Sequence, residues 1–244
     1  MTSARLALFV ALVVSATGCA NAMPSFAGGS TTPERRTDLA IGGAARVPTG
    51  DLRTEKNTNP ATQSYEQAAN AGGIVPVAYG RYGLRRGNDL GLLVAGANVR
   101  VDYRHEHVLE EASTRPALVY GVAPYVGFVP NANEGDGRGQ RIGVHLPFTY
   151  SIDFGGIYDV WVGPRLDLEY QWGEFATATG SMAGAHAFAM RGGGVLGLAA
   201  GFRRFHAMVE LTAAYEQWWG DQAGASLKRG GIVLIPAFGL RLRI

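Results

Sequence analysis

The 244-residue sequence predicts an all-β chain that closes into an antiparallel transmembrane β-barrel of about ten strands. The main observation is a long alternation around residues 155–157, where every second residue of 142–154 and of 158–172 is apolar. A period of two is typical of β-strands, and a short glycine-containing loop between two such strands predicts a hairpin. Both strands exceed the roughly 9–11 residues that a strand needs to cross a bilayer.

The two faces of these strands carry different chemistry. One face is bulky and free of charge, whereas the other is rich in Arg, Asp and Glu. This division indicates lipid outside a barrel and a polar lumen inside it. A soluble lipocalin-like barrel or β-sandwich, with the apolar face as its core, is the structural alternative. The net charge of +2 argues against a nucleic-acid partner.

The N-terminus has the pattern of an exported protein. Residues 1–18 place Arg5 before an apolar run and then small residues, which predicts a secretory signal peptide. The sequence Ala16-Thr17-Gly18-Cys19 resembles the lipobox of bacterial lipoproteins, which implies lipidation of Cys19 and, with Ala20 after it, sorting to the cell outer membrane. Residues 19–36 are small and polar and predict a lipidated, flexible tether before a barrel over 37–244. An ordinary signal peptide is the alternative.

The alternating segments predict the strands in order. These are 37–47, 74–84, 89–104, 117–128, 141–154, 158–172, 188–202, 205–219 and 232–244. The segment 89–104 is one strand or, with a turn at 95–98, two. A single-chain bacterial barrel has an even number of strands, which favours two here and ten in total. Eight strands, with 37–47 outside the wall, is the alternative.

Loop lengths and aromatic residues give the barrel a direction. If the C-terminus is periplasmic, residues 48–71, 129–139, 173–186 and 220–229 form outer loops, and 155–157 and 203–204 form inner turns. Two aromatic girdles are then expected, an inner one of Phe154, Tyr158, Phe202 and Phe205 and an outer one of Tyr170, Trp172, Phe188 and Tyr215. Prolines at 124, 147, 164 and 236 predict bulges, because each removes a ladder hydrogen bond.

Two further segments carry resemblances to bacterial outer-membrane barrels. Residues 81–92, with Arg-Tyr-Gly-Leu and Asp-Leu-Gly-Leu around a turn, resemble a hairpin that recurs in these proteins. The tail from Gly239 to Ile244 resembles their terminal insertion signal, with Ile where Phe is usual. This second resemblance implies insertion by the outer-membrane assembly machinery.

The polar face predicts a charge network in the lumen. Its members are Arg141, Asp153, Asp159, Arg165, Asp167, Glu169, Glu210, Arg241 and Arg243. We expect these groups to pair across strands, because an unpaired charge in a confined space is costly. No catalytic, cofactor or metal site is predicted. His206 with Glu210 is the candidate for a base and its orienting acid. His105-Glu106-His107 has side chains that could hold a metal ion, but we expect it to form a solvated polar turn.

The function expected from these features is a structural or interaction role in the cell envelope, without enzymatic activity or a cofactor. Outer-membrane lipid and envelope proteins, bound through loops 48–71 and 173–186, are the expected partners. A narrow pore for small solutes is the first alternative, and a membrane-embedded hydrolase is the second.

Overall fold

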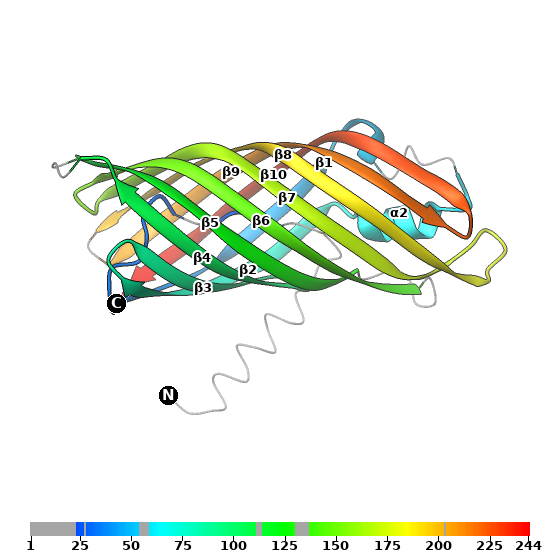
Figure 1. The fold of residues 1–244 in the computed structure, drawn as a ribbon, viewed down its shortest axis with the longest axis horizontal. Coiled ribbons are helices and arrows are strands. Elements are labelled where there is room, and N and C mark those ends of the chain that lie inside the picture. The colour runs from blue at the N-terminus through cyan, green and yellow to red at the C-terminus, as the bar shows by residue number, and fades with distance from the viewer. Residues whose placement is uncertain (1–22, 27, 54–58, 111–113, 130–136, 203) are drawn as a thin grey trace, which may run out of the picture.

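The chain forms a closed antiparallel barrel, as predicted. The computed structural model describes residues 23–26, 28–53, 59–110, 114–129, 137–202 and 204–244. Their strands are β1 Thr37–Pro48, β2 Gly73–Arg85, β3 Asn88–Ala95, β4 Asn98–Val108, β5 Thr114–Val129, β6 Gly137–Phe154, β7 Tyr158–Ala176, β8 Met182–Phe202, β9 Phe205–Gln222 and β10 Ala225–Arg243. A 3-10 turn η1 (Gly50–Leu52) and a helix α2 (Gln63–Ala69) lie between β1 and β2. Figure 1 shows the strongly tilted strands and α2 at one end.

The ten-strand count rests on β1. This strand pairs with β2 on one side and with β10 on the other, so that Leu39 lies opposite both Gly80 and Leu242. The segment 89–104 divides into β3 and β4 as expected, joined at residues 96–97. The alternative of eight strands with 37–47 outside the wall is therefore wrong.

The register of the wall is regular. Phe154 lies opposite Tyr158 across residues 155–157, where Gly155 and Gly156 both adopt positive φ angles that an L side chain rarely adopts. The register on both sides of Pro147 and Pro236 is unshifted. The bulges expected at the prolines are therefore not needed, because the surrounding ladder bonds hold each proline in its strand.

Two expected outer loops are largely strand. β7 continues to Ala176 and β8 begins at Met182, which leaves only residues 177–181 of the expected loop 173–186. Residues 220–229 likewise shrink to a turn at 223–224 between β9 and β10. Glycine and small residues hide the alternation here, but Phe175 still points inward and is buried.

The connection between β1 and β2 closes one mouth of the barrel. Tyr65 of α2 packs on Phe175 of β7, with ring centroids 4.9 Å apart. Glu66 of the same helix forms an ion pair with Arg229 of β10 at 2.9 Å. Burial raises the pKa of the Tyr65 phenol, so this side chain stays neutral in the mouth. The connection expected as a plain loop over 48–71 is thus partly folded into the barrel.

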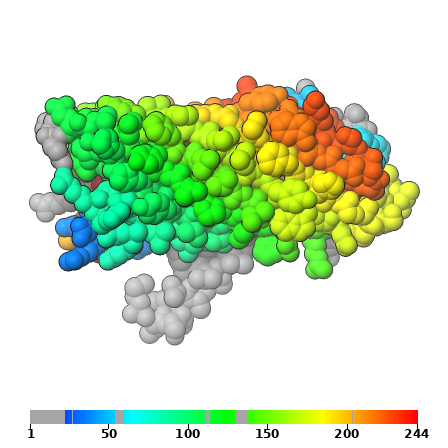
Figure 2. Space-filling model, viewed as in Figure 1, coloured from blue at the N-terminus to red at the C-terminus, as the bar shows by residue number. Residues whose placement is uncertain are grey.

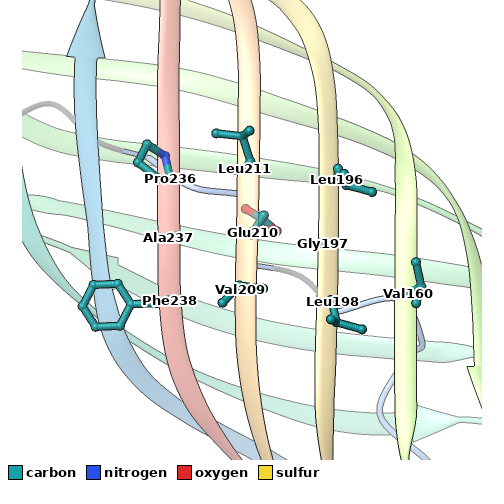
Figure 3. A pocket seen from close by; sticks show the side chains of 10 residues that line it. All are labelled: Val160, Leu196, Gly197, Leu198, Val209, Glu210, Leu211, Pro236, Ala237 and Phe238. Carbon is teal, nitrogen blue, oxygen red and sulfur yellow. The ribbon is translucent and has the colours of Figure 1, made fainter.

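The outer surface of the wall is apolar between two aromatic girdles. The exposed aromatics include the residues expected in the girdles, Phe154, Tyr158, Phe202 and Phe205 towards one end and Tyr170, Trp172, Phe188 and Tyr215 towards the other, and further ones such as Phe148 and Phe238 elsewhere on the wall. Figure 2 shows the wall closed by side chains along the visible face. A shallow hollow of about 510 Å³ lies in this surface, lined chiefly by Val160, Leu196, Leu198, Val209, Leu211 and Phe238. Figure 3 shows these side chains on their neighbouring strands. An exposed apolar belt of this kind is the lipid-facing surface of a transmembrane barrel.

The described residues contain no helix that is long and apolar enough to span a membrane.

Candidate functional site

The lumen is occupied by the chain's own N-terminal residues. Residues 23–26 and 28–32, which we call the luminal segment, are all buried. The segment enters at the barrel end that carries the C-terminus, where Arg35 N–H donates to the Gly83 carbonyl (Figure 1). The flexible tether expected over 19–36 is therefore wrong for these residues. The small or absent side chains of Ser25 and of residues 28–32 leave the backbone free to bind the charged lumen.

Four luminal carboxylates accept hydrogen bonds from backbone N–H groups of the luminal segment. Glu210 binds the N–H of Phe26 (2.9 Å), Asp159 that of Gly29 (3.1 Å), Glu106 that of Thr31 (2.7 Å) and Asp89 that of Thr32 (2.8 Å). These carboxylates come from four different strands, β9, β7, β4 and β3. Hydrogen bonds to charged groups are the stronger kind, so the segment is fixed from several sides.

Three luminal arginines donate to its carbonyl groups. Arg165 binds the carbonyl of Met23 (3.1 Å), Arg100 those of Pro24 (2.7 Å) and Ser25 (2.6 Å), and Arg104 those of Gly28 (3.3 Å) and Ser30 (3.2 Å). With the four N–H groups above, nine backbone groups of the segment are bound by charged side chains of the wall. The lumen therefore recognises the backbone of an irregular segment, in which Phe26 and Gly28 have φ angles of 45° and 68°.

Side chains fix the position of the segment along the lumen. Phe26 is fully buried and meets Tyr79 edge to face, with ring centroids 5.6 Å apart. Gly28 has a φ of 68°, and a Cβ on it would lie 2.7 Å from Arg241 Nη1. A Cβ on Gly29 would overlap the Asp159 carboxylate. An aromatic residue followed at the second and third positions by glycine therefore fits this site.

Most of the predicted network residues lie in the lumen and form ion pairs. The pairs are Arg165–Asp167 (2.8 Å), Arg191–Glu169 (3.0 Å), Arg241–Asp159 (3.3 Å) and Arg243–Asp38 (3.4 Å). Glu210 is buried but binds Phe26 and the Trp161 indole instead of a cation. Arg141 is buried too, and its Nε and Nη1 have no hydrogen-bond partner among the described residues.

Asp153 lies outside this network. Its carboxylate accepts a hydrogen bond from the Gly156 N–H at 2.6 Å, so it caps the turn between β6 and β7. It is also partly exposed. The alternation places Asp153 on the polar face, but its position at the end of the strand puts it at the rim of the lumen.

Four network members were missing from the sequence prediction, namely Arg46, Asp89, Glu106 and Arg115. Arg46 pairs with Glu216 (2.6 Å), Arg104 with Asp89 (2.5 Å) and Arg115 with Glu106 (2.8 Å). Asp89 and Glu106 sit at predicted strand ends or turns, where a polar residue is ordinarily solvated. The alternation of polar and apolar residues continues through Asp89 in β3 and Glu106 in β4, and this alternation could have placed both on the inward face.

A serine, a histidine and a carboxylate meet in the lumen. Ser25 Oγ lies 3.0 Å from His145 Nε2, and His145 Nδ1 lies 2.7 Å from Asp167 Oδ1. This is the order of nucleophile, base and orienting acid in hydrolases. The three residues are at most 2% exposed, and Ser25 belongs to the luminal segment itself. In this closed state the contacts tie the segment to β6 and β7.

The other histidines do not form the sites considered from the sequence. His206 Nε2 contacts the Gly156 carbonyl at 2.8 Å, whereas Glu210 binds Phe26 N–H, so the two do not act as a base and orienting acid. Within β4, Glu106 is buried in the lumen while His107 is exposed. Among the described residues there is no group of three or more His, Cys, Asp or Glu side chains that could hold a metal ion.

Comparison with solved structures finds small surface barrels at low similarity. The attachment invasion locus protein Ail of Yersinia pestis is 11% identical, over 86% of this chain and 99% of Ail, with a TM-score of 0.35. Neisserial surface protein A is 11% identical, over 86% of this chain and 95% of that protein (TM-score 0.31), and outer membrane phospholipase A of Escherichia coli is 10% identical, over 94% and 96% (TM-score 0.33). The chain matches no family model and no curated protein sequence.

Proposed function

We propose that the chain is an outer-membrane β-barrel protein with a structural or interaction role in the cell envelope, and that its own N-terminal residues keep its lumen closed. The observation that carries this proposal is the set of nine backbone groups of the luminal segment that charged side chains bind. An open pore for small solutes would instead have water at these positions. Closure thus favours the structural or interaction role over the pore.

The proposed orientation follows the positions of the connections. The end with Thr37 and Ile244 faces the periplasm, and the mouth covered by α2 faces outward. Residues 48–71 then carry the longest outer connection among the described strands, with the turn 177–181 as the other part of the expected partner-binding loops. Envelope partners would bind the exposed parts of these two connections.

Lipid attachment at Cys19 is a second part of the proposal. The position of Met23 limits how far from the lumen the lipid can be anchored. Cys19 is four residues before Met23, and four residues of fully extended chain span at most about 14 Å, at roughly 3.6 Å per residue. The Met23 carbonyl is held by Arg165, well inside β7. Anchoring of a Cys19 lipid in the periplasmic leaflet therefore competes with the binding of Met23 to Arg165 inside the lumen. Palmitate labelling that survives Cys19→Ser would contradict attachment at this residue.

Conductance measurements test the closed barrel. We expect the complete mature chain, reconstituted in a planar lipid bilayer, to give no stable current steps, because the luminal segment and α2 fill the passage. Heat-modifiable migration in gels verifies that the reconstituted protein is folded. Regular current steps from the folded, complete chain would contradict the proposal.

A further inference from the structure

We propose that the lumen is a preformed, selective binding site for a peptide of the pattern aromatic-x-Gly-Gly, and that the luminal segment is its exchangeable occupant. This inference rests on the closed barrel proposed above. It adds the chemical class of the ligand. It also adds that the same site can bind a peptide that belongs to a separate molecule.

The segment is not a part of the barrel wall. Sheet pairing closes the wall from β1 through β10 without it. The described residues of the segment, 23–26 and 28–32, form no backbone–backbone hydrogen bond with a strand, and such bonds begin at Arg35. The contacts that hold the segment therefore come from side chains, and the barrel can keep its ladder when the segment leaves.

Each charged group that binds the segment also has a partner within the wall. Arg100 pairs with Asp102 (2.7 Å), Arg104 with Asp89 (2.5 Å), Arg165 with Asp167 (2.8 Å), Asp159 with Arg241 (3.3 Å) and Glu106 with Arg115 (2.8 Å), while Glu210 accepts from Trp161 Nε1 (3.3 Å). Withdrawal of the segment thus leaves every one of these charged groups except Glu210 in an ion pair, and Glu210 keeps its hydrogen bond from the Trp161 indole, so the cost of an unpaired buried charge is limited to one carboxylate. The same pairs orient the arginines and carboxylates before a peptide arrives, and this lowers the entropic cost of binding.

The site selects its ligand by shape. The Phe26 ring fills a space next to Gly239, whose absent side chain makes room for it. Gly28 and Gly29 lie where a Cβ would meet Arg241 and Asp159. Beyond them Thr31 Oγ1 donates to Glu106 at 2.5 Å. The ligand is therefore a peptide with an aromatic anchor, two glycines and then hydroxyl residues, and its backbone has positive φ angles at the anchor and at the first glycine, as at Phe26 (45°) and Gly28 (68°).

The test uses a chain that begins at Pro33 and keeps all ten strands, together with a labelled peptide of residues 23–34. We expect saturable binding of this peptide to the folded, truncated barrel by fluorescence anisotropy. The matched control peptide carries Gly29→Val and should bind about 5- to 150-fold more weakly, which is the overpacking cost of roughly 1–3 kcal/mol converted at 1.4 kcal/mol per tenfold. Equal binding of both peptides, or of neither, would overturn the proposal.

A second arm covers failure of the truncated chain to fold. The complete chain should not bind the labelled peptide, because its site is occupied, whereas the complete chain with Gly29→Val should bind it. Absence of binding to that folded variant would also overturn the inference. If the complete chain is silent in the bilayer but neither the folded truncated barrel nor the folded Gly29→Val chain binds the peptide, exchange alone is contradicted. A complete chain that conducts contradicts the closed barrel itself.

Discussion

Replacement of Glu216 by alanine is expected to lower the free energy of unfolding of the barrel by about 3–5 kcal/mol, the usual cost of breaking a buried ion pair on one side. Glu216 is fully buried on β9, and its two oxygens bind Arg46 of β1 (2.6 Å) and Arg191 of β8. Its removal leaves Arg46 without its carboxylate partner. The Trp218 indole, which also donates to Glu216, loses its acceptor.

Urea unfolding in lipid vesicles measures this effect. Glu34→Ala is the matched control, because Glu34 pairs with Arg35 at 3.7 Å on the exposed surface and such pairs contribute little. We expect the control to unfold at the same urea concentration as the natural chain. If Glu216→Ala unfolds there too, the buried network is not a source of stability.

Leu211→Arg is expected to prevent insertion of most of the chain into lipid vesicles. Leu211 is 46% exposed and lies opposite Leu196 of β8, on the apolar wall between the two aromatic girdles. A charge near the bilayer midplane of such a barrel costs about 2–4 kcal/mol. The folded fraction is measured by heat-modifiable migration after mixing with vesicles.

Leu211→Ala serves as the control for loss of side-chain volume, and it should insert nearly as well as the natural chain. A soluble barrel predicts the opposite behaviour, because an arginine on a water-facing wall is solvated at little cost. Equal yields for Leu211→Arg and Leu211→Ala would therefore contradict the lipid-facing assignment.

The wall of the barrel was predictable because residues close together in the sequence determine its strands. Alternation over 142–172 gives the strand type, the face and the hairpin from neighbouring residues alone, and the structure pairs Phe154 with Tyr158 as that pattern requires. The strand count was also accessible, since the even number of strands decided the division of 89–104. Strand ends were less accessible, because glycine and small residues around 173–186 conceal the continued alternation.

The occupied lumen could not be predicted, because it depends on contacts between residues that are far apart in the sequence. Residues 23–32 have the composition of a flexible linker. What gives the luminal segment its structure is the convergence of carboxylates and arginines from strands far away in the sequence. Ser25 and His145, for example, are 120 positions apart. The charges of the lumen were visible on the strand faces, but the backbone that they bind was not.

The position of the luminal segment is tested most directly by the reactivity of a single thiol. Cys19→Ser removes the only cysteine of the chain, and Ser25→Cys or Ser181→Cys is then added; Ser25 is 1% exposed, whereas Ser181 lies in the exposed turn between β7 and β8. In the folded barrel, a water-soluble maleimide should modify Ser181→Cys rapidly and Ser25→Cys only after unfolding. Equal rates for the two folded variants would contradict a lumen closed by the chain's own N-terminal residues.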